Sequence, residues 1–242
     1  MKKLCSVIIL AGGLATRLRP MTETIPKALI SIHNEPFIYH QLRLLNKQGI
    51  RHVILCLGYL GEMVESCVGD GSQFGMTIEY AYDGPMLLGT AGAIKKTLPL
   101  LDDVFFVLYG DSYLNCDYLS IQAAFFNMKK PALMTIFHNK NQWDGSNVDY
   151  LNGRILSYSK RSPTPSMSYI DYGLGMFHAQ AFDDISITQP YDLSLIYENL
   201  SKKNQLAGIE IKERFFEIGS FTGIKELEYY LHKNQLNRSV QL

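Results

Sequence analysis

Neither sign of charge is in excess in this sequence, because 23 lysines and arginines balance 23 aspartates and glutamates over 242 residues. Proteins whose main surface binds nucleic acid or an anionic membrane are usually basic. The balance therefore argues against both partners, and any phosphate binding has to be local. With 47% hydrophobic and 19% charged residues, the composition is that of a globular protein long enough to bury a substantial core.

Long apolar runs are also missing from the sequence. No stretch approaches the roughly 18 residues that a membrane-spanning helix needs, and Gly12 interrupts the first apolar segment too early for a signal peptide. The four cysteines are scattered without a C-x-x-C pair, which predicts reduced thiols that carry no metal or redox chemistry. We therefore expect a cytoplasmic protein without a membrane partner.

The chain is organised around residues 7–20. The apolar run at residues 7–11 predicts a short strand that is buried on both faces. Gly12 and Gly13 follow, and they allow backbone amides to point into a common concavity. One hydroxyl and two cations surround that concavity: Thr16, Arg17 and Lys27. This combination suits a polyphosphate and predicts a cradle for a nucleoside triphosphate.

The motif differs from two familiar phosphate-binding loops. No Gly-Lys-Ser/Thr sequence closes it as in a P-loop, and the third glycine of the dinucleotide fingerprint is missing. It resembles instead the signature of the sugar-1-phosphate nucleotidyltransferases, Leu-Ala-Gly-Gly-x-Gly-Thr-Arg-Leu-x-Pro followed by Pro-Lys. Ala15 stands where that family has glycine. If this position requires a positive φ or close approach of a phosphate, alanine would weaken binding.

Hydrophobic periodicity predicts alternating strands and helices along the chain. We expect strands at residues 7–11, 28–32, 53–57, 77–80, 104–108 and 132–137, a hairpin and strand over 148–160, and helices over 36–48, 62–68 and 89–98. The resemblance to the nucleotidyltransferases implies a further strand at residues 169–177 and a helix over 224–232. The first strand–helix–strand unit should be right-handed and parallel. The sequence therefore predicts a single α/β domain, Rossmann-like, with a mixed and mostly parallel sheet.

The most apolar run, residues 104–108, is followed by Gly110 and Asp111. Open α/β sheets bind ligands at the carboxyl ends of their central strands. Asp111 is therefore the first candidate for a Mg²⁺ ligand, with a turn or helix-capping role as the alternative. Residues 89–92, Gly-Thr-Ala-Gly, begin a helix, and such an N-terminus suits either an anion or tight packing.

The motifs follow one another in the order of the nucleotidyltransferase family, so the resemblance covers nearly the whole chain and implies roles for the matching residues. The implied nucleotide-binding residues are Leu10, Ala11, Gly12, Gly13, Thr16, Arg17, Gly89, Thr90 and Gly92. The implied sugar-binding residues are Asn147, Lys160, Asp171 and Gly173. The implied catalytic residues are Arg17, Lys27, Asp111 and Lys160, and the implied Mg²⁺ ligands are Asp111 and Glu217. The resemblance divides the single domain, residues 1–242, into a nucleotide-binding half up to about residue 115 and a sugar-binding half after it.

Some of these positions depart from the family pattern. Asp171 replaces a residue that is often asparagine, and Ser159 and Arg161 replace the neighbours of the family's lysine. Glu217 replaces the aspartate that serves as the second magnesium ligand, and it is one methylene longer. Because Mg²⁺ requires a nearly octahedral oxygen shell, this change would move the ion or insert a water molecule.

The resemblance implies condensation of an NTP with a sugar 1-phosphate to an NDP-sugar and pyrophosphate, for cell-surface polysaccharide or a related glycan. Residues 34–37 and 88–94 are similar to heptose- and mannose-1-phosphate guanylyltransferases, and residues 69–75 to N-acetylmuramate-1-phosphate uridylyltransferases, so GTP is favoured and UTP comes second. Choline-phosphate cytidylyl transfer on the same scaffold and a non-catalytic nucleotide-sugar-binding regulatory subunit are the alternatives. A homo-oligomer is left open.

Overall fold

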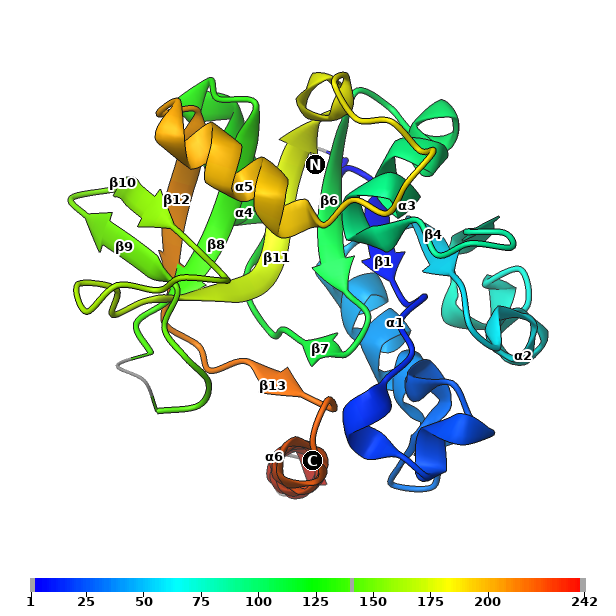
Figure 1. Cartoon of the computed structure of the whole chain (residues 1–242). Coiled ribbons are helices and arrows are strands. Elements are labelled where there is room, and N and C mark those ends of the chain that lie inside the picture. The colour runs from blue at the N-terminus through cyan, green and yellow to red at the C-terminus, as the bar shows by residue number, and fades with distance from the viewer. Residues whose placement is uncertain (1–2, 140–141, 240–242) are drawn as a thin grey trace.

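The computed structural model describes residues 3–139 and 142–239, and within them one nine-stranded sheet forms the centre of the molecule (Figure 1). In order across the sheet the strands are β5 (Thr77–Tyr82), β4 (His52–Leu57), β1 (Val7–Leu10), β6 (Val104–Tyr109), β11 (Ile170–His178), β8 (Ala132–Phe137), β12 (Leu206–Ile211), β10 (Arg154–Tyr158) and β9 (Val148–Leu151). The predicted α/β fold with a mixed sheet is confirmed.

Parallel and antiparallel pairing are equally frequent among the described strands of this sheet. The pairs β5–β4, β4–β1, β1–β6 and β12–β8 are parallel. The pairs β6–β11, β11–β8, β12–β10 and β10–β9 are antiparallel. The first half of the chain therefore forms the parallel part, whereas the second half is less parallel than the sequence analysis expects.

Helices cover both faces of the sheet, because its central strands are apolar on both sides. Val7 and Ile9 of β1 pack into one buried cluster, and Ile8 packs into the other. The first cluster includes residues of α1 (Phe37–Gln48), α2 (Gly61–Val68) and α4 (Tyr118–Met128). The second includes residues of α3 (Gly89–Thr97) and α5 (Leu193–Lys202), and α5 crosses in front of the sheet in Figure 1.

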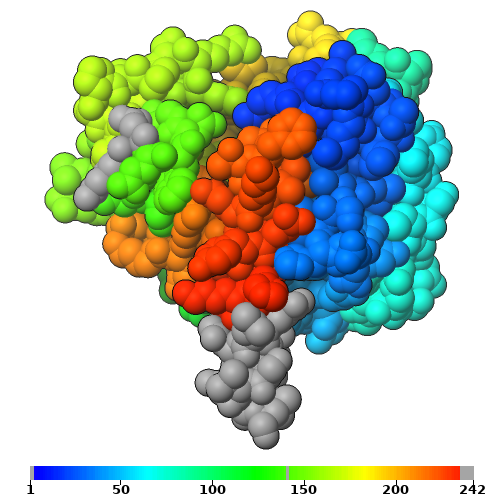
Figure 2. All heavy atoms as spheres, turned by 90° about the horizontal axis from the view of Figure 1, so that it is seen from below, coloured from blue at the N-terminus to red at the C-terminus, as the bar shows by residue number. Residues whose placement is uncertain are grey.

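A third, smaller cluster lies below the sheet and joins the two ends of the chain. The helix α6 (Phe221–Ser239) contributes Leu227, which packs with Leu18, Ile32 and Phe37 from the beginning of the chain. Viewed from below, the orange and red C-terminal segment lies against the blue N-terminal segment (Figure 2). This packing brings the segment around Glu217 close to the glycine-containing loop.

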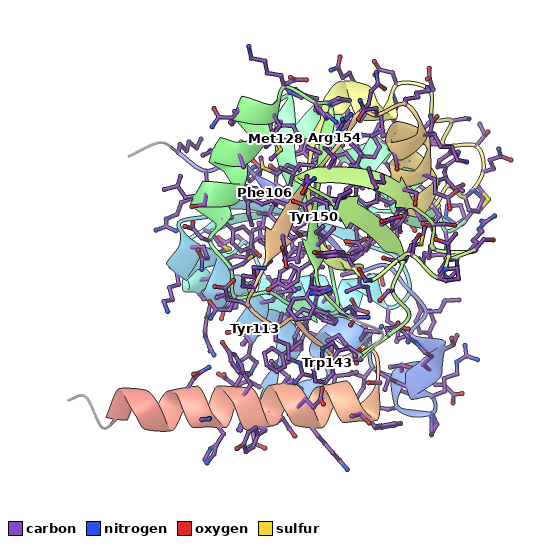
Figure 3. The ribbon with its side chains drawn as sticks, turned by 90° about the vertical axis from the view of Figure 1, so that its left-hand side faces the viewer. Phe106, Tyr113, Met128, Trp143, Tyr150 and Arg154 are labelled. Atoms are coloured by element: carbon purple, nitrogen blue, oxygen red, sulfur yellow. The ribbon has the colours of Figure 1, made fainter. Side chains whose placement is uncertain are left out.

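The segment between β12 and β13 (Phe216–Glu217) is fixed by an arginine stack. The guanidinium of Arg214 lies 3.5 Å from the ring centroid of Trp143 and 4.9 Å from that of Phe216. The same guanidinium pairs with Glu226 of α6. Figure 3 shows Trp143 above this helix, so α6 is held by both apolar and charged contacts.

Two short sheets position the loops beside the main sheet. The strands β2 (Ser31–Ile32) and β3 (Glu35–Pro36) form a hairpin, and β7 (Ser112–Tyr113) pairs with β13 (Phe216–Glu217). The strand expected at residues 28–32 is wrong for its first part, because a 3₁₀ turn, Lys27–Leu29, precedes β2.

In the described part of the chain, no helix has both the length and the apolar character needed to cross a membrane.

Candidate active site

A cavity of about 230 Å³ opens at the carboxyl ends of β5, β4, β1 and β6. Because the chain passes from β1 to β4 on one side and returns to β6 on the other, this is the point where the strand order reverses. Fifteen residues line the cavity: Leu10, Ala11, Gly12, Gly13, Lys27, Ala28, Cys56, Asp83, Leu87, Gly89, Thr90, Ala93, Tyr109, Gly110 and Asp111. They include six of the nine predicted nucleotide-binding residues.

Close backbone contacts between strand ends form the floor of the cavity. The amide of Gly110 donates to the carbonyl of Leu10 at 3.0 Å, and a Cβ atom on Gly110 would lie 2.4 Å from that oxygen. Only glycine allows the ends of β6 and β1 to approach this closely. Gly13 has open space where its Cβ would be, so the loop leaves room above the floor.

Ala15 adopts the left-handed conformation that the family glycine would adopt freely. Its φ is 49° and its ψ is 41°, and its carbonyl accepts a hydrogen bond of 2.8 Å from the buried Thr22 hydroxyl. This backbone conformation is unfavourable for alanine by about 1–2 kcal/mol. The neighbouring residues Thr16 and Arg17 begin a 3₁₀ turn and do not line the cavity.

Lys27 and Asp111 form an ion pair at the cavity wall. The Lys27 Nζ atom lies 3.0 Å from Asp111 Oδ2, and the side chains are 20% and 29% exposed. A cation and a carboxylate predicted from separate motifs are therefore direct neighbours beside the proposed triphosphate cradle.

Glu217 and Arg17 face the same small space as Asp111. A Cβ atom on Gly219 would lie 2.7 Å from Glu217 Oε2, 3.2 Å from Arg17 Nη2 and 3.5 Å from Asp111 Oδ2. The pairing of β13 with β7 places Glu217 opposite Ser112, and the Ile218 amide donates to the Asp111 carbonyl at 2.9 Å. The structure thus brings together three residues predicted from distant motifs.

These two carboxylates fit a magnesium ion by their chemistry, since Mg²⁺ prefers oxygen ligands. The Glu217 carboxylate already accepts hydrogen bonds from the Gly219 amide and, at 2.6 Å, from the Ser220 hydroxyl. A carboxylate has about four acceptor positions, so a metal could still be bound. Among residues 3–139 and 142–239, no group of three or more His, Cys, Asp or Glu residues could hold an ion. Water and substrate oxygens would complete the shell.

The beginning of α3 is only partly available to a ligand. Gly89 and Thr90 line the cavity, but the Ala91 amide donates to the Tyr191 carbonyl at 2.9 Å. Gly92 is buried, and its amide lies 3.4 Å from the same carbonyl. The structure therefore places Gly92 behind the cavity wall rather than in it.

Three of the predicted sugar-binding residues form a hydrogen-bonded group behind Tyr109. The Asp171 carboxylate accepts from the Tyr109 hydroxyl at 3.2 Å and from the Gly173 amide at 3.0 Å. The Asp171 amide donates to Asn147 Oδ1 at 3.0 Å. Burial raises the pKa of Asp171 to about 6, although the bonds from Gly173 and Tyr109 act in the opposite direction. Tyr109 connects this group to the cavity, because it lines the wall.

Lys160 lies outside the cavity lining. Its Nζ atom is 3.7 Å from Asp192 Oδ2, and its side chain is 59% exposed. Asp192 also caps α5 by accepting from the Ser194 amide at 2.8 Å. Burial acts to raise the pKa of Asp192, but the bonds from Ser194 and Lys160 bring it below its usual value.

Two polar residues of the cavity, Asp83 and Tyr109, are not among the site residues predicted from the sequence. Both stand at the ends of strands, since β6 ends at Tyr109 and β5 ends one residue before Asp83. That position was the available signal, because the parallel strand ends meet at one edge of the sheet. Burial raises the pKa of Asp83.

The known proteins that this chain resembles are sugar-1-phosphate nucleotidyltransferases. Residues 6–145 match the family described as "Nucleotidyl transferase". An N-acetylmuramate alpha-1-phosphate uridylyltransferase of Neisseria meningitidis is 25% identical over 91% of this chain and 96% of its own length. A D-glycero-alpha-D-manno-heptose 1-phosphate guanylyltransferase of Campylobacter jejuni is 28% identical over 88% and 93%, respectively.

Other relatives are longer than this chain. The match covers only 52% of a UTP–glucose-1-phosphate uridylyltransferase of Synechocystis. It covers only 60% of a mannose-1-phosphate guanylyltransferase catalytic subunit beta of Xenopus tropicalis. Among solved structures, a Bacillus anthracis protein described as a glucose-1-phosphate thymidylyltransferase superposes with a TM-score of 0.83 at 22% identity, covering 93% of this chain and 94% of that one. At this identity, the structural likeness supports the fold alone.

Proposed function

The chain belongs to the nucleotidyl transferase family, and we propose that it condenses an NTP with a sugar 1-phosphate to give an NDP-sugar and pyrophosphate. GTP is the preferred nucleotide in this proposal and UTP is second, because residues 88–94 are similar to guanylyltransferases and residues 69–75 to uridylyltransferases. The relatives include enzymes of both kinds. The product would supply cell-surface polysaccharide or a related glycan.

The observation that carries the proposal is the Lys27–Asp111 ion pair in the wall of the cavity that the glycine-containing loop also lines. Arg17 and Glu217 face a common space with Asp111. A site for nucleotidyl transfer needs positive charge around the phosphates and a carboxylate for the metal. These residues supply both.

In the proposed reaction an oxygen of the sugar phosphate attacks the α-phosphorus of the NTP. The new bond joins this oxygen to the α-phosphorus, the bond to the β-phosphate oxygen breaks, and pyrophosphate leaves with the bonding electron pair. The attacking group is already an anion at neutral pH, so no general base is needed. Catalysis then depends on an in-line arrangement and on charge stabilisation.

The chain's own residues have separate tasks in this arrangement. Gly12 and Gly13 admit the triphosphate, and Arg17 and Lys27 stabilise negative charge on it. Lys160 attracts the sugar phosphate. Asp111 and Glu217 would hold Mg²⁺, which when bound neutralises charge on the phosphates.

We also propose that residues up to about 115 bind the nucleotide and that the following residues bind the sugar. The predicted nucleotide residues all precede residue 115, whereas Asn147, Asp171 and Gly173 form their hydrogen-bonded group after it. The proposed compartment is the cytoplasm, in keeping with four free cysteines.

The proposal is tested by pyrophosphate release with Mg²⁺, using GTP, UTP, CTP and dTTP against a panel of sugar 1-phosphates and phosphocholine. Release that requires one NTP and one sugar 1-phosphate together is the expected result. Release with CTP and phosphocholine instead would make the chain a choline-phosphate cytidylyltransferase.

A non-catalytic regulatory subunit is the second candidate. It is favoured by the left-handed Ala15 and by a Glu217 carboxylate that already accepts two hydrogen bonds. Tight binding of an intact nucleotide sugar without turnover by any substrate pair would support this candidate and contradict the proposed enzyme.

A further inference from the structure

The helix α4 differs from the other α-helices in its lack of charge. Residues Tyr118–Met128 contain no aspartate, glutamate, lysine or arginine, whereas each of the other α-helices in the described part of the chain contains at least two of them. One side of α4 packs into the core, through residues such as Ile121 and Phe125. The opposite side lies at the flank of the molecule (Figure 3). It is therefore exposed without the charges that usually solvate a surface helix.

An apolar stripe runs along this exposed side. Leu119 is 47% exposed and Phe126 is 49% exposed, and Ala123 is exposed between them. Spacings of four and three residues place these side chains on one face of the helix. Met128, which is 38% exposed, lies at the end of α4 (Figure 3). A surface rich in phenylalanine and methionine and poor in charge is typical of the centre of a protein–protein interface.

Charges of opposite sign stand at the two ends of the stripe. Asp117, directly before α4, is exposed. Burial, followed by the charges of Glu213 and Asp117, raises the pKa of the Cys116 thiol to about 12, so both carboxylates lie near the beginning of the helix. Lys129 and Lys130 follow its other end. Among residues 3–139 and 142–239, neither lysine forms an ion pair with a carboxylate.

The stripe and its ends are complementary to themselves in an antiparallel arrangement. If a two-fold axis passes through Ala123 of two copies, residues at equal distances before and after Ala123 face each other. Lys129, six residues after Ala123, then faces Asp117, six residues before it. Leu119 faces the residue after Phe126. A parallel arrangement would instead bring like charges together, which is unfavourable.

A hollow beside Phe126 supplies space for such a contact. It has a volume of about 310 Å³ and lies where α4 ends and β8 begins. Phe125, Phe126, Lys129 and His178 are among the residues that line it. In the antiparallel arrangement, Leu119 of the second copy lies at this hollow. Side chains that fill a pocket of the partner contribute most of the binding energy of a typical interface.

We propose that two copies of this chain form a dimer through antiparallel packing of their α4 helices. The apolar stripe supplies the buried centre of the interface, and the attraction of Lys129 to Asp117 and Glu213 sets the direction of the helices. None of the fifteen residues that line the active-site cavity belongs to α4. The dimer is therefore independent of the proposed reaction, and each can be tested without the other.

Sedimentation velocity of the wild-type protein over a range of concentrations tests the dimer and gives its Kd. Phe126→Glu places a carboxylate in the stripe, where burial between two copies is unfavourable for a charge. This variant should raise the Kd at least about 30-fold. Tyr229→Glu is the matched control, because Tyr229 is an aromatic residue of another helix, α6, and is 71% exposed. It should leave the Kd unchanged.

A charge exchange tests the direction of packing. Lys129→Glu and Glu213→Lys each place like charges opposite each other in the dimer, and each should raise the Kd by about 10-fold. An equal mixture of the two variants should form mixed dimers more readily than either variant dimerises alone, since opposite charges then face each other again. Lys129 is changed rather than Lys130, because Lys130 also donates to Asn204 Oδ1 and to the Leu206 carbonyl.

A wild-type protein that stays monomeric at every concentration would overturn the proposal. So would a dimer with the same Kd in Phe126→Glu and in the wild type, or one that Tyr229→Glu weakens as much as Phe126→Glu does. Circular dichroism and thermal unfolding show whether each variant is folded. If Phe126→Glu does not fold, the charge exchange decides, and mixed variants that dimerise no better than either one alone would contradict the antiparallel interface.

Discussion

Lys27 and Asp111 are far apart in sequence, but their charged groups are in direct contact at the cavity wall. Ion pairs with this much exposure contribute about 0–1 kcal/mol to stability. The pair is therefore better explained by ligand binding than by folding.

Asp111→Asn should reduce pyrophosphate release by at least about 100-fold, because it removes the carboxylate proposed to hold the metal among the reacting phosphates. Its free energy of unfolding should change by no more than about 1 kcal/mol. Turnover and urea unfolding of the same preparation measure both. Loss of nucleotide binding together with the fold would assign Asp111 a structural role instead.

Asp171 predicts a specific pH dependence of stability. Its pKa is about 6 in the folded protein and 3.8 ordinarily. Between about pH 4 and pH 6 the folded state therefore binds more protons, so the free energy of unfolding falls as pH rises, by about 3 kcal/mol from this residue. Urea unfolding of wild type and Asp171→Asn across this range isolates the effect. The wild type should lose stability relative to the variant as pH rises, and a constant difference would contradict the prediction.

At the scale of elements, the loops after β1 and β6 depend on glycines for different reasons. A Cβ atom on Gly110 would overlap the Leu10 carbonyl, whereas one on Gly13 would meet no atom within 4 Å. Gly110→Ala should therefore destabilise the protein by about 1–3 kcal/mol. Gly13→Ala should change stability by less than about 0.5 kcal/mol and still weaken triphosphate binding. Thermal unfolding and GTP titration test both variants, and equal destabilisation would contradict this account.

The pairing of β13 with β7 predicts the behaviour of Glu217. Glu217→Gln keeps an oxygen acceptor for the Ser220 hydroxyl but loses the negative charge beside Asp111. The Mg²⁺ concentration for half-maximal pyrophosphate release should rise by about 10- to 100-fold. Ser220→Ala is the control, because it removes the hydrogen bond and keeps the carboxylate. An unchanged Mg²⁺ requirement in Glu217→Gln would exclude Glu217 as a ligand.

The sequence predicts most strands and helices because their periodicity is local. Residues 28–30 are an exception, since a short apolar run does not distinguish a strand from a 3₁₀ turn. The hairpin that follows turns through His33 and Asn34, both with positive φ, as in a type I′ turn. The last helix begins before residue 224, because the Ser220 hydroxyl accepts from the Gly223 amide at 2.9 Å and acts as its cap.

The candidate site is only partly legible in the sequence. The glycine-containing loop, Lys27 and Asp111 belong to compact motifs, and the structure brings them to one cavity. Asp83 and Tyr109 reach the same cavity through the order of four strands, which depends on long-range pairing. The contact between Lys160 and Asp192 likewise depends on where α5 packs.

At the scale of the whole molecule, the two proposed halves share one core. The largest buried cluster includes Val7 and Val53 from the first half and Leu133 and Tyr172 from the second, and the pairing of β6 with β11 continues the sheet between them. Far-UV circular dichroism and fluorescence of Trp143 should therefore report one coincident unfolding transition. Two separate transitions would mean that the halves fold independently.

The proposed reaction transfers the nucleotidyl group of an NTP, with its α-phosphate, to a sugar 1-phosphate. The most direct measurement uses GTP labelled separately at the α- and γ-phosphates, with the sugar 1-phosphate that supports turnover. We expect α-label in the nucleotide sugar, γ-label in pyrophosphate, and neither product with Asp111→Asn. Transfer of the γ-label to the sugar phosphate, or release of pyrophosphate without a labelled nucleotide sugar, would contradict the proposed reaction.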